Sequence, residues 1–233
     1  MNPGEDTFLS CSSDDTLRIW DLKSPNAIGK LFLSQPHLAA FDPSANVIAV
    51  ASPSAQTILL YDFRNFDKEP FAAFDTLQAA NVVKPGSCSR NWTKLEFSND
   101  GKSLLVGTAG HGHYVLDAFD GSLKQYLTRK AGGVRRLFAG EKQAEGIAES
   151  EKKLETSGDV CFSPDGRYVL SGQHKSNVLV YDIATPSQEK SMLPTHELEL
   201  KTEASVIQYN PRFNMFATAD RDLHLWAPDR DAL

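Results

Sequence analysis

Residues 159–183 read Asp-Val-Cys-Phe-Ser-Pro-Asp-Gly-Arg-Tyr-Val-Leu-Ser-Gly-Gln-His-Lys-Ser-Asn-Val-Leu-Val-Tyr-Asp-Ile. Three short apolar runs in this stretch are rich in β-branched or aromatic residues and are bounded by turn residues, which predicts three β-strands. In the first turn, Pro164 fixes φ at the second position and Gly166 suits the fourth. The runs do not alternate apolar with polar residues. Both faces of each strand must therefore be covered, as in a sheet packed between neighbouring sheets.

The same unit recurs elsewhere in the chain. An aromatic residue and a turn lead to an apolar strand and a closing residue in the segments 41–62, 97–117 and 209–226, and residues 8–22 supply a fifth ending on Trp20-Asp21. The closing positions fall at 20, 61, 116, 181 and 226. A self-similar unit of roughly 40–45 residues that closes on Trp-Asp is the signature of a WD repeat, in which four strands form one propeller blade.

The repeats predict a single all-β domain over residues 1–233, a WD40 β-propeller in the form of an incomplete open arc of about five blades. The expected units are 1–36, 37–74, 92–128, 159–195 and 196–227, with insertions at 75–91 and 129–158. The first unit lacks its first strand and the last unit lacks its fourth, which gives 18 expected strands. Exposed edge strands favour association. We therefore expect a fragment that does not close into a ring and that self-associates or is poorly soluble.

The larger insertion begins with a basic piece that contains Arg129, Lys130, Arg135 and Arg136, and continues with many Glu, Lys and Ala residues. Such a segment cannot bury a core of its own, which favours a weakly packed surface loop. A docking element for phosphate or for an acidic partner is the alternative.

Composition narrows the classes of function. The net charge of −6 does not indicate a dedicated nucleic-acid binder. Cys11, Cys88 and Cys161 lack metal-ligand spacing, so we interpret them as reduced thiols in or near the core. No apolar run approaches the ~20 residues needed to cross a bilayer, and the first residues lack a signal-peptide pattern. We expect no membrane association and no secretion.

One hydrogen-bond network can be predicted in the last unit. WD blades that carry it join a His, a Ser or Thr, an Asp in a turn and the closing Trp, and the matching residues here are His196, Thr218, Asp220 and Trp226. A Thr-His-Asp set also invites a hydrolase interpretation, but the sequence has no nucleophile elbow or oxyanion-hole pattern. We interpret these residues as a structural staple and predict no catalytic residues.

A second pair of histidines lies in Gly110-His111-Gly112-His113. Two His in a Gly-rich turn could bind a metal, but no Cys or carboxylate stands at a suitable spacing. Solvated turn residues are the expected outcome, with no metal and no cofactor.

Several segments resemble a particular family. Residues 60–74 (Leu-Tyr-Asp-Phe-Arg-Asn-Phe-Asp-Lys-Glu-Pro-Phe-Ala-Ala-Phe), residues 92–102 (Trp-Thr-Lys-Leu-Glu-Phe-Ser-Asn-Asp-Gly-Lys), Phe41-Asp42-Pro43 and Asp117-Ala118-Phe119 are similar to the WD-repeat subunit of the COMPASS histone methyltransferase, which also serves in the cleavage and polyadenylation factor. Members of that family have seven blades, so the resemblance implies that about two N-terminal blades are absent here.

The resemblance implies a nuclear, non-enzymatic adaptor. Its partners would be the SET-domain catalytic subunit and other COMPASS subunits, supporting methylation of histone H3 on lysine 4, with links to RNA polymerase, cleavage and polyadenylation factor and RNA 3′-end formation. The alternatives are a generic WD adaptor in ubiquitin ligation or transport, and a metalloprotein or enzyme that uses His111, His113 or His196. The expected contact loop contains Arg64, Phe66, Asp67, Lys68 and Phe71, because interfaces favour aromatic residues and Arg.

Overall fold

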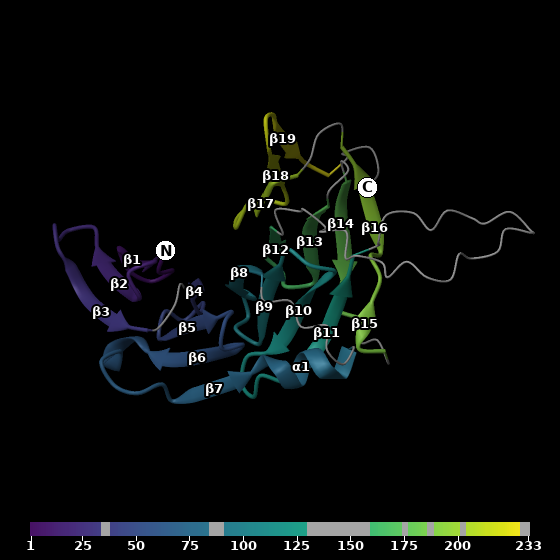
Figure 1. Cartoon of the computed structure of the whole chain (residues 1–233). Helices are drawn as coiled ribbons and strands as arrows, with labels where there is room; N and C mark the ends of the chain where they lie inside the picture. Colours follow the sequence, from purple (N-terminus) through teal and green to yellow (C-terminus); the bar gives the residue numbers. More distant parts are fainter. Residues whose placement is uncertain are drawn as a thin grey trace, which may run out of the picture.

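The computed structural model describes residues 1–33, 38–83, 91–129, 159–173, 177–185, 189–200 and 204–228. The described chain is nearly all β, as predicted, and forms five sheets that follow one another along the sequence. Figure 1 shows these sheets arranged as an arc, with the first sheet (purple) and the fifth sheet (yellow) at its two ends.

Neighbouring strands in every sheet are antiparallel, except for one parallel pair in the third sheet. The first sheet contains β1 (Thr7–Ser12), β2 (Thr16–Asp21) and β3 (Ala27–Phe32); the second contains β4 (Leu38–Phe41), β5 (Val47–Ser52), β6 (Thr57–Asp62) and β7 (Ala72–Asp75). The third contains β8 (Trp92–Phe97), β9 (Ser103–Thr108), β10 (Gly112–Asp117), β11 (Leu123–Thr128) and, parallel to β11, β15 (Ser191–Met192). The fourth contains β12 (Val160–Phe162), β13 (Tyr168–Gln173), β14 (Asn177–Asp182) and β16 (His196–Glu199); the fifth contains β17 (Val206–Tyr209), β18 (Phe216–Ala219) and β19 (Leu223–Trp226).

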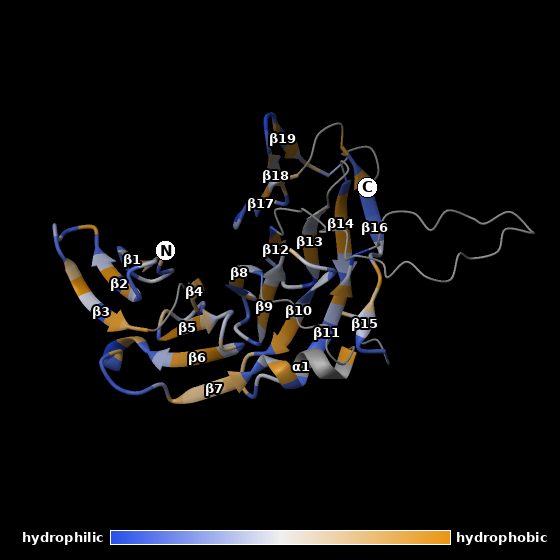
Figure 2. Ribbon diagram, viewed as in Figure 1, coloured by the Kyte–Doolittle hydropathy of each residue, from blue (hydrophilic) through white to orange (hydrophobic). Residues whose placement is uncertain are grey.

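The core lies between neighbouring sheets. Leu17 and Ile19 pack against Ile48 between the first two sheets. Buried apolar clusters also fill the space between the second and third sheets and between the third and fourth sheets. Between the fourth and fifth sheets, Leu170 and Ile207 share one cluster. Figure 2 colours much of β14 orange, while the outer strand β16 is blue. The prediction that both faces of the strands are covered is therefore confirmed for sheets inside the arc.

The first strands of the repeats line the inside of the arc. β4 lies beside β8 and β12 lies beside β17, so neighbouring repeats contact each other through these strands. The first and fifth sheets each have three strands, as the sequence predicts. Each of them has one face that no other described sheet covers (Figure 1).

Three expectations need correction. The described residues form 19 strands rather than 18, because the short strand β15 adds a fifth strand to the third sheet. The boundary expected between residues 195 and 196 is wrong, since β16 pairs with β14 and so belongs to the fourth sheet. The insertion at 75–91 contains a helix, α1 (Thr76–Val83). Apart from Arg129, the insertion at 129–158 lies outside the described residues.

Candidate interaction surface

The turns of the sheets gather on one face of the arc. In each repeat the turn after the first strand and the turn after the third strand lie at the same end, because antiparallel strands alternate in direction. Backbone hydrogen bonds join the two turns: Phe63 N to Asn46 O (2.7 Å), Ala118 N to Lys102 O (3.1 Å) and Ile183 N to Arg167 O (2.9 Å). We call this surface the turn face and define it by residues 42–46, 62–71, 98–102, 117–122, 163–167, 182–185 and 210–214.

The turn after the first strand is held by a side chain at its first position. The backbone N–H of a residue five positions later donates to that side chain, over 2.8 Å from Val47 to Asp42 Oδ1 and over 2.9 Å from Tyr168 to Ser163 Oγ. The turn predicted at Pro164 and Gly166 is confirmed, since Gly166 has φ of 70° and donates to Ser163 O over 2.9 Å. These turns are fixed by local bonds.

The Asp that follows the closing residue of a repeat has a local role as well. In four sheets its carboxylate accepts the backbone N–H of the residue two positions later: Asp21 from Lys23 (2.8 Å), Asp62 from Arg64 (2.9 Å), Asp117 from Phe119 (2.8 Å) and Asp182 from Ala184 (3.1 Å). This is the Asx turn that Asp favours. The repeated Asp therefore fixes the turn after the third strand in these four repeats.

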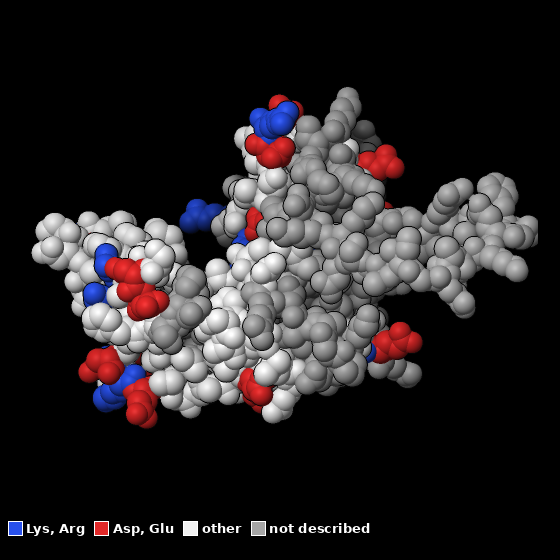
Figure 3. Space-filling model, viewed as in Figure 1, with Lys and Arg blue, Asp and Glu red and all other residues white. Residues whose placement is uncertain are grey.

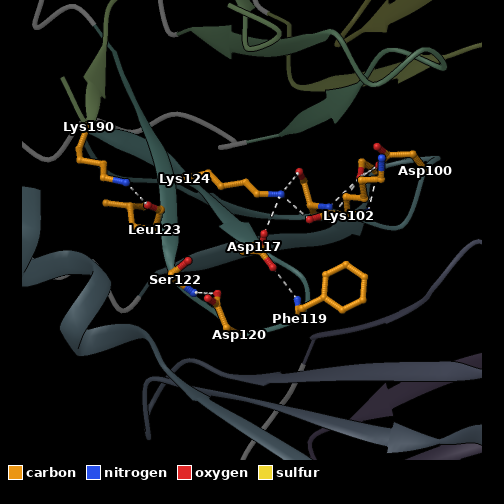
Figure 4. Close-up of polar contacts among 11 residues, drawn as sticks. Asp100, Lys102, Asp117, Phe119, Asp120, Ser122, Leu123, Lys124 and Lys190 are labelled. Carbon is orange, nitrogen blue, oxygen red and sulfur yellow. Dashed lines mark hydrogen bonds and ion pairs between the residues drawn. The ribbon is translucent and has the colours of Figure 1, made fainter. Parts of the chain in front are cut away.

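Figure 4 shows both turns of the third sheet. Lys124 Nζ lies 3.1 Å from Asp117 Oδ2 and donates to Lys102 O, so it joins the two turns. Partial burial tends to raise the pKa of Asp117, but the Phe119 N–H and Lys124 outweigh this and hold the pKa below its usual value. The Phe119 side chain is 78% exposed and points away from these polar contacts (Figure 4). The turn therefore presents an exposed aromatic ring from a rigid base.

The predicted contact loop is also on the turn face. It contains the short 3-10 helix η1 (Phe63–Asn65), which Asp62 caps. Phe66 is half-buried against Gly29 of β3, where an added Cβ would come within 2.4 Å of the ring. Phe66 therefore packs the second sheet on the first. The other four predicted residues are exposed: Arg64, Asp67, Lys68 and Phe71. Figure 3 shows charges of both signs over this loop and over the tip of the β18–β19 hairpin.

The predicted network in the last unit is only partly assembled. Trp226 Nε1 donates to Thr218 Oγ1 over 3.0 Å, and Trp20 makes the same bond to Ser10 over 2.8 Å in the first sheet. Asp220 instead accepts from Ser205 Oγ over 2.9 Å. His196 is exposed on β16, and within the described residues no hydrogen bond joins it to Thr218, Asp220 or Trp226.

His113 is not a solvated turn residue, and that expectation is wrong. It is fully buried on β10, where Nδ1 accepts from Thr108 N over 3.0 Å and Nε2 lies 2.7 Å from Ser171 Oγ in the fourth sheet. Burial, with Arg129 beside the ring, holds the pKa of His113 well below its usual value. Ser171 on β13 is equivalent in register to Thr218 on β18. In the fourth sheet the hydroxyl at this position is therefore bonded by a histidine of the preceding sheet, whereas in the fifth sheet it is bonded by the closing Trp. The sequence did not predict this burial, because Gly110 and Gly112, which precede His113, are typical of an exposed turn.

The Ser171–His113 pair resembles a nucleophile and its base, but both side chains are fully buried. No substrate can reach a hydroxyl that is closed off in this way. Within the described parts of the chain, no three His, Cys, Asp or Glu residues are placed to hold a metal ion. None of the described helices is long and apolar enough to cross a membrane.

The cysteine thiols differ in their exposure to solvent. Cys161 is fully buried on β12, and burial raises its pKa to about 12. Cys11 is exposed on β1, which corrects its expected place in or near the core. Cys88 lies outside the described residues.

Comparison with known proteins finds one matching repeat family and several relatives of this chain. Residues 1–21 and 156–182 match the family described as WD domain, G-beta repeat. WD repeat-containing protein 82 of Drosophila melanogaster is 34% identical over 98% of this chain and 62% of its own length. COMPASS component SWD2 of Saccharomyces cerevisiae is 30% identical over 98% of this chain and 63% of its own length.

Set1 complex component swd2 of Schizosaccharomyces pombe is 30% identical over 94% of this chain and 55% of its own length. The chain thus spans about three fifths of the length of these curated relatives. It contains WD repeats and is similar, over nearly its whole length, to proteins named as COMPASS and Set1 complex components and as WD repeat-containing protein 82.

Proposed function

We propose that this protein is a non-catalytic scaffold subunit of a Set1-type complex that methylates histone H3 on lysine 4, and that it works in the nucleus. The observation that carries the proposal is the similarity of 94–98% of this chain to relatives named as components of COMPASS and of the Set1 complex. The proposal extends the membership of those relatives to this protein through the repeats that they share.

The turn face supports a binding role. The backbone of its turns is already held by internal hydrogen bonds, so the backbone that carries the exposed side chains loses little conformational freedom when a partner binds. The proposed partners are the SET-domain subunit and other subunits of the complex. The proposal also includes links to RNA polymerase, to cleavage and polyadenylation factor and to RNA 3′-end formation.

The proposed contact is the loop that contains Arg64, Lys68 and Phe71. Arginine and aromatic side chains supply much of the binding energy of protein interfaces. We exclude Phe66 from the test, because its removal would disturb the packing on Gly29. The double variant Arg64→Ala with Phe71→Ala removes two exposed side chains and leaves the turn hydrogen bonds in place.

Affinity capture of the tagged full-length protein, with quantification of the SET-domain subunit that accompanies it, tests the proposal. We expect wild-type protein to capture that subunit and the double variant to capture about tenfold less, as for the loss of a binding hot spot. The control is Leu193→Ala, which removes an apolar side chain that is 64% exposed and lies outside both the turn face and the end sheets.

Absence of the SET-domain subunit from the wild-type capture would contradict the proposal. Recovery of a ubiquitin-ligase or transport complex instead would favour the generic adaptor. Normal capture by the double variant would remove the loop as the contact and leave membership of the complex intact.

A further inference from the structure

The four interfaces between neighbouring sheets share one packing arrangement. Side chains alternate between the two faces of a strand, so residues that pair across neighbouring strands form a row on one face of the sheet. We call the row that faces the next sheet along the chain the forward row. In the first four sheets it contains the apolar pairs Leu9 with Ile19, Ala49 with Leu60, Leu105 with Val115, and Leu170 with Val180.

The opposite face of each sheet presents a bulkier row toward the preceding sheet, which we call the rear row. In the second to fifth sheets it contains Phe41, Ile48 and Tyr61; Phe97, Leu104 and Leu116; Phe162, Val169 and Tyr181; and Tyr209 and Phe216. Each forward row shares an apolar cluster with the rear row of the next sheet. Every interface inside the arc therefore packs a rear row that contains an aromatic ring on an apolar forward row.

The fifth sheet has a forward row that no other described sheet covers. Gln208, Ala217 and Leu225 pair across β17, β18 and β19, and Ala217 and Leu225 are equivalent in register to Leu170 and Val180. The three residues line an apolar hollow of about 310 Å³, and Leu225 is 69% exposed. Because Ala217 is smaller than Leu170, this row leaves room for a large ring.

The first sheet has a rear row that no other described sheet covers. Phe8 and Trp20 pair across β1 and β2 and stack, with ring centroids 6.1 Å apart and planes 12° apart. Phe216 and Trp226 stack in the same way on the rear face of the fifth sheet, at 5.4 Å and 5°. Phe8 and Trp20 are each only partly buried. The first sheet thus presents a preformed aromatic row at one end of the arc, and the fifth sheet presents an apolar hollow at the other (Figure 1).

We propose that the rear row of the first sheet packs on the forward row of the fifth sheet of a second copy of this protein. The contact would continue the arrangement of the four interfaces inside the arc, with large rings against small side chains as close packing requires. Two different surfaces meet in it, so repetition builds an open chain or a closed ring of copies. The inference goes beyond scaffold membership and uses no residue of the turn face.

Two complementary variants of the 233-residue chain test the proposal by sedimentation velocity. Phe32→Glu blocks the rear face of the first sheet, because Phe32 is 76% exposed and its neighbour Leu31 packs toward the second sheet. Leu225→Glu blocks the forward row of the fifth sheet. We expect each variant alone to be monomeric, since each has lost one of the two surfaces. Their equimolar mixture should form a dimer of twice the monomer mass that does not grow further, whereas wild type should form larger species as its concentration rises.

Leu193→Glu is the matched control, because Leu193 is 64% exposed outside the end sheets, and it should associate as wild type does. Circular dichroism and thermal unfolding check the fold of each variant, and Phe32→Ser with Leu225→Ser replace the glutamate variants where the fold is altered.

Association of either end-sheet variant alone would show that like faces pair with each other, and this would overturn the proposal. A monomeric wild type, a mixture that forms no dimer, or equal loss of association in Leu193→Glu would overturn it as well. Capture of the SET-domain subunit is a separate readout, so either proposal can fail alone.

Discussion

At the scale of single residues, the inner turns show how local chemistry sets the backbone. Gly101 and Gly166 occupy the fourth position of these turns with φ of 70°, and Ala45 occupies the same position in the second repeat with φ of 62°. The N–H of Ala45 still donates to Asp42 O over 3.0 Å. Alanine thus adopts a conformation in which its Cβ is unfavourable and for which glycine is suited.

Replacing Ala45 with glycine should raise the free energy of unfolding by about 0.5–1 kcal/mol, because the steric penalty exceeds the added entropy of the unfolded chain. The reverse change, Gly101→Ala, should lower it. Equilibrium denaturation in urea measures both. A destabilised Ala45→Gly variant would contradict this description of the turn.

At the scale of elements, His113 ties β10 of the third sheet to β13 of the fourth. Because its pKa is held below the usual value, the unfolded chain takes up a proton below pH ~6.5 where the folded chain does not. The stability that this neutral histidine contributes is present above that pH and is lost as the pH falls. The free energy of unfolding should therefore decrease by up to about 1.4 kcal/mol per pH unit from this group.

The variant His113→Gln removes this titration, and its unfolding free energy should depend less on pH between 6.5 and 5. His111→Gln is the matched control, because His111 is an exposed histidine two residues away. Denaturation curves at several pH values provide the measurement. Identical slopes for wild type and His113→Gln would rule out a neutral, buried His113.

The elements also show how far the sequence determines the fold. Ser163, Pro164 and Gly166 predict their turn correctly, since the reasons for it lie within a few residues. Helix α1 and strand β15 could not be predicted, because α1 has only eight residues and β15 is two residues that pair in parallel with a distant strand. His196 joins the fourth sheet through pairing with β14, which no local pattern encodes.

At the scale of the whole molecule, the two end sheets expose apolar residues. Ile28 and Phe32 on the first sheet are 50% and 76% exposed, and Leu223 and Leu225 on the fifth are 68% and 69% exposed. Repeat proteins are stabilised by contacts between neighbouring repeats, so an uncovered sheet loses one such contact. Exposed edges and apolar faces of this kind favour association.

We expect the 233-residue chain alone to self-associate in sedimentation velocity at micromolar concentration, and Leu225→Ser to reduce this association. Leu193→Ser should have little effect, because Leu193 is 64% exposed but lies outside the end sheets. A monomeric chain with a closed, ring-shaped scattering profile would contradict the open arc.

The proposed function is scaffold support for the methylation of histone H3 on lysine 4. Its most direct test is mass-spectrometric quantification of lysine-4 methylation in cells that lack the protein. We predict that methylation falls and that the full-length protein restores it, whereas a form carrying Arg64→Ala and Phe71→Ala restores it incompletely. Unchanged methylation in cells without the protein would contradict the proposed function.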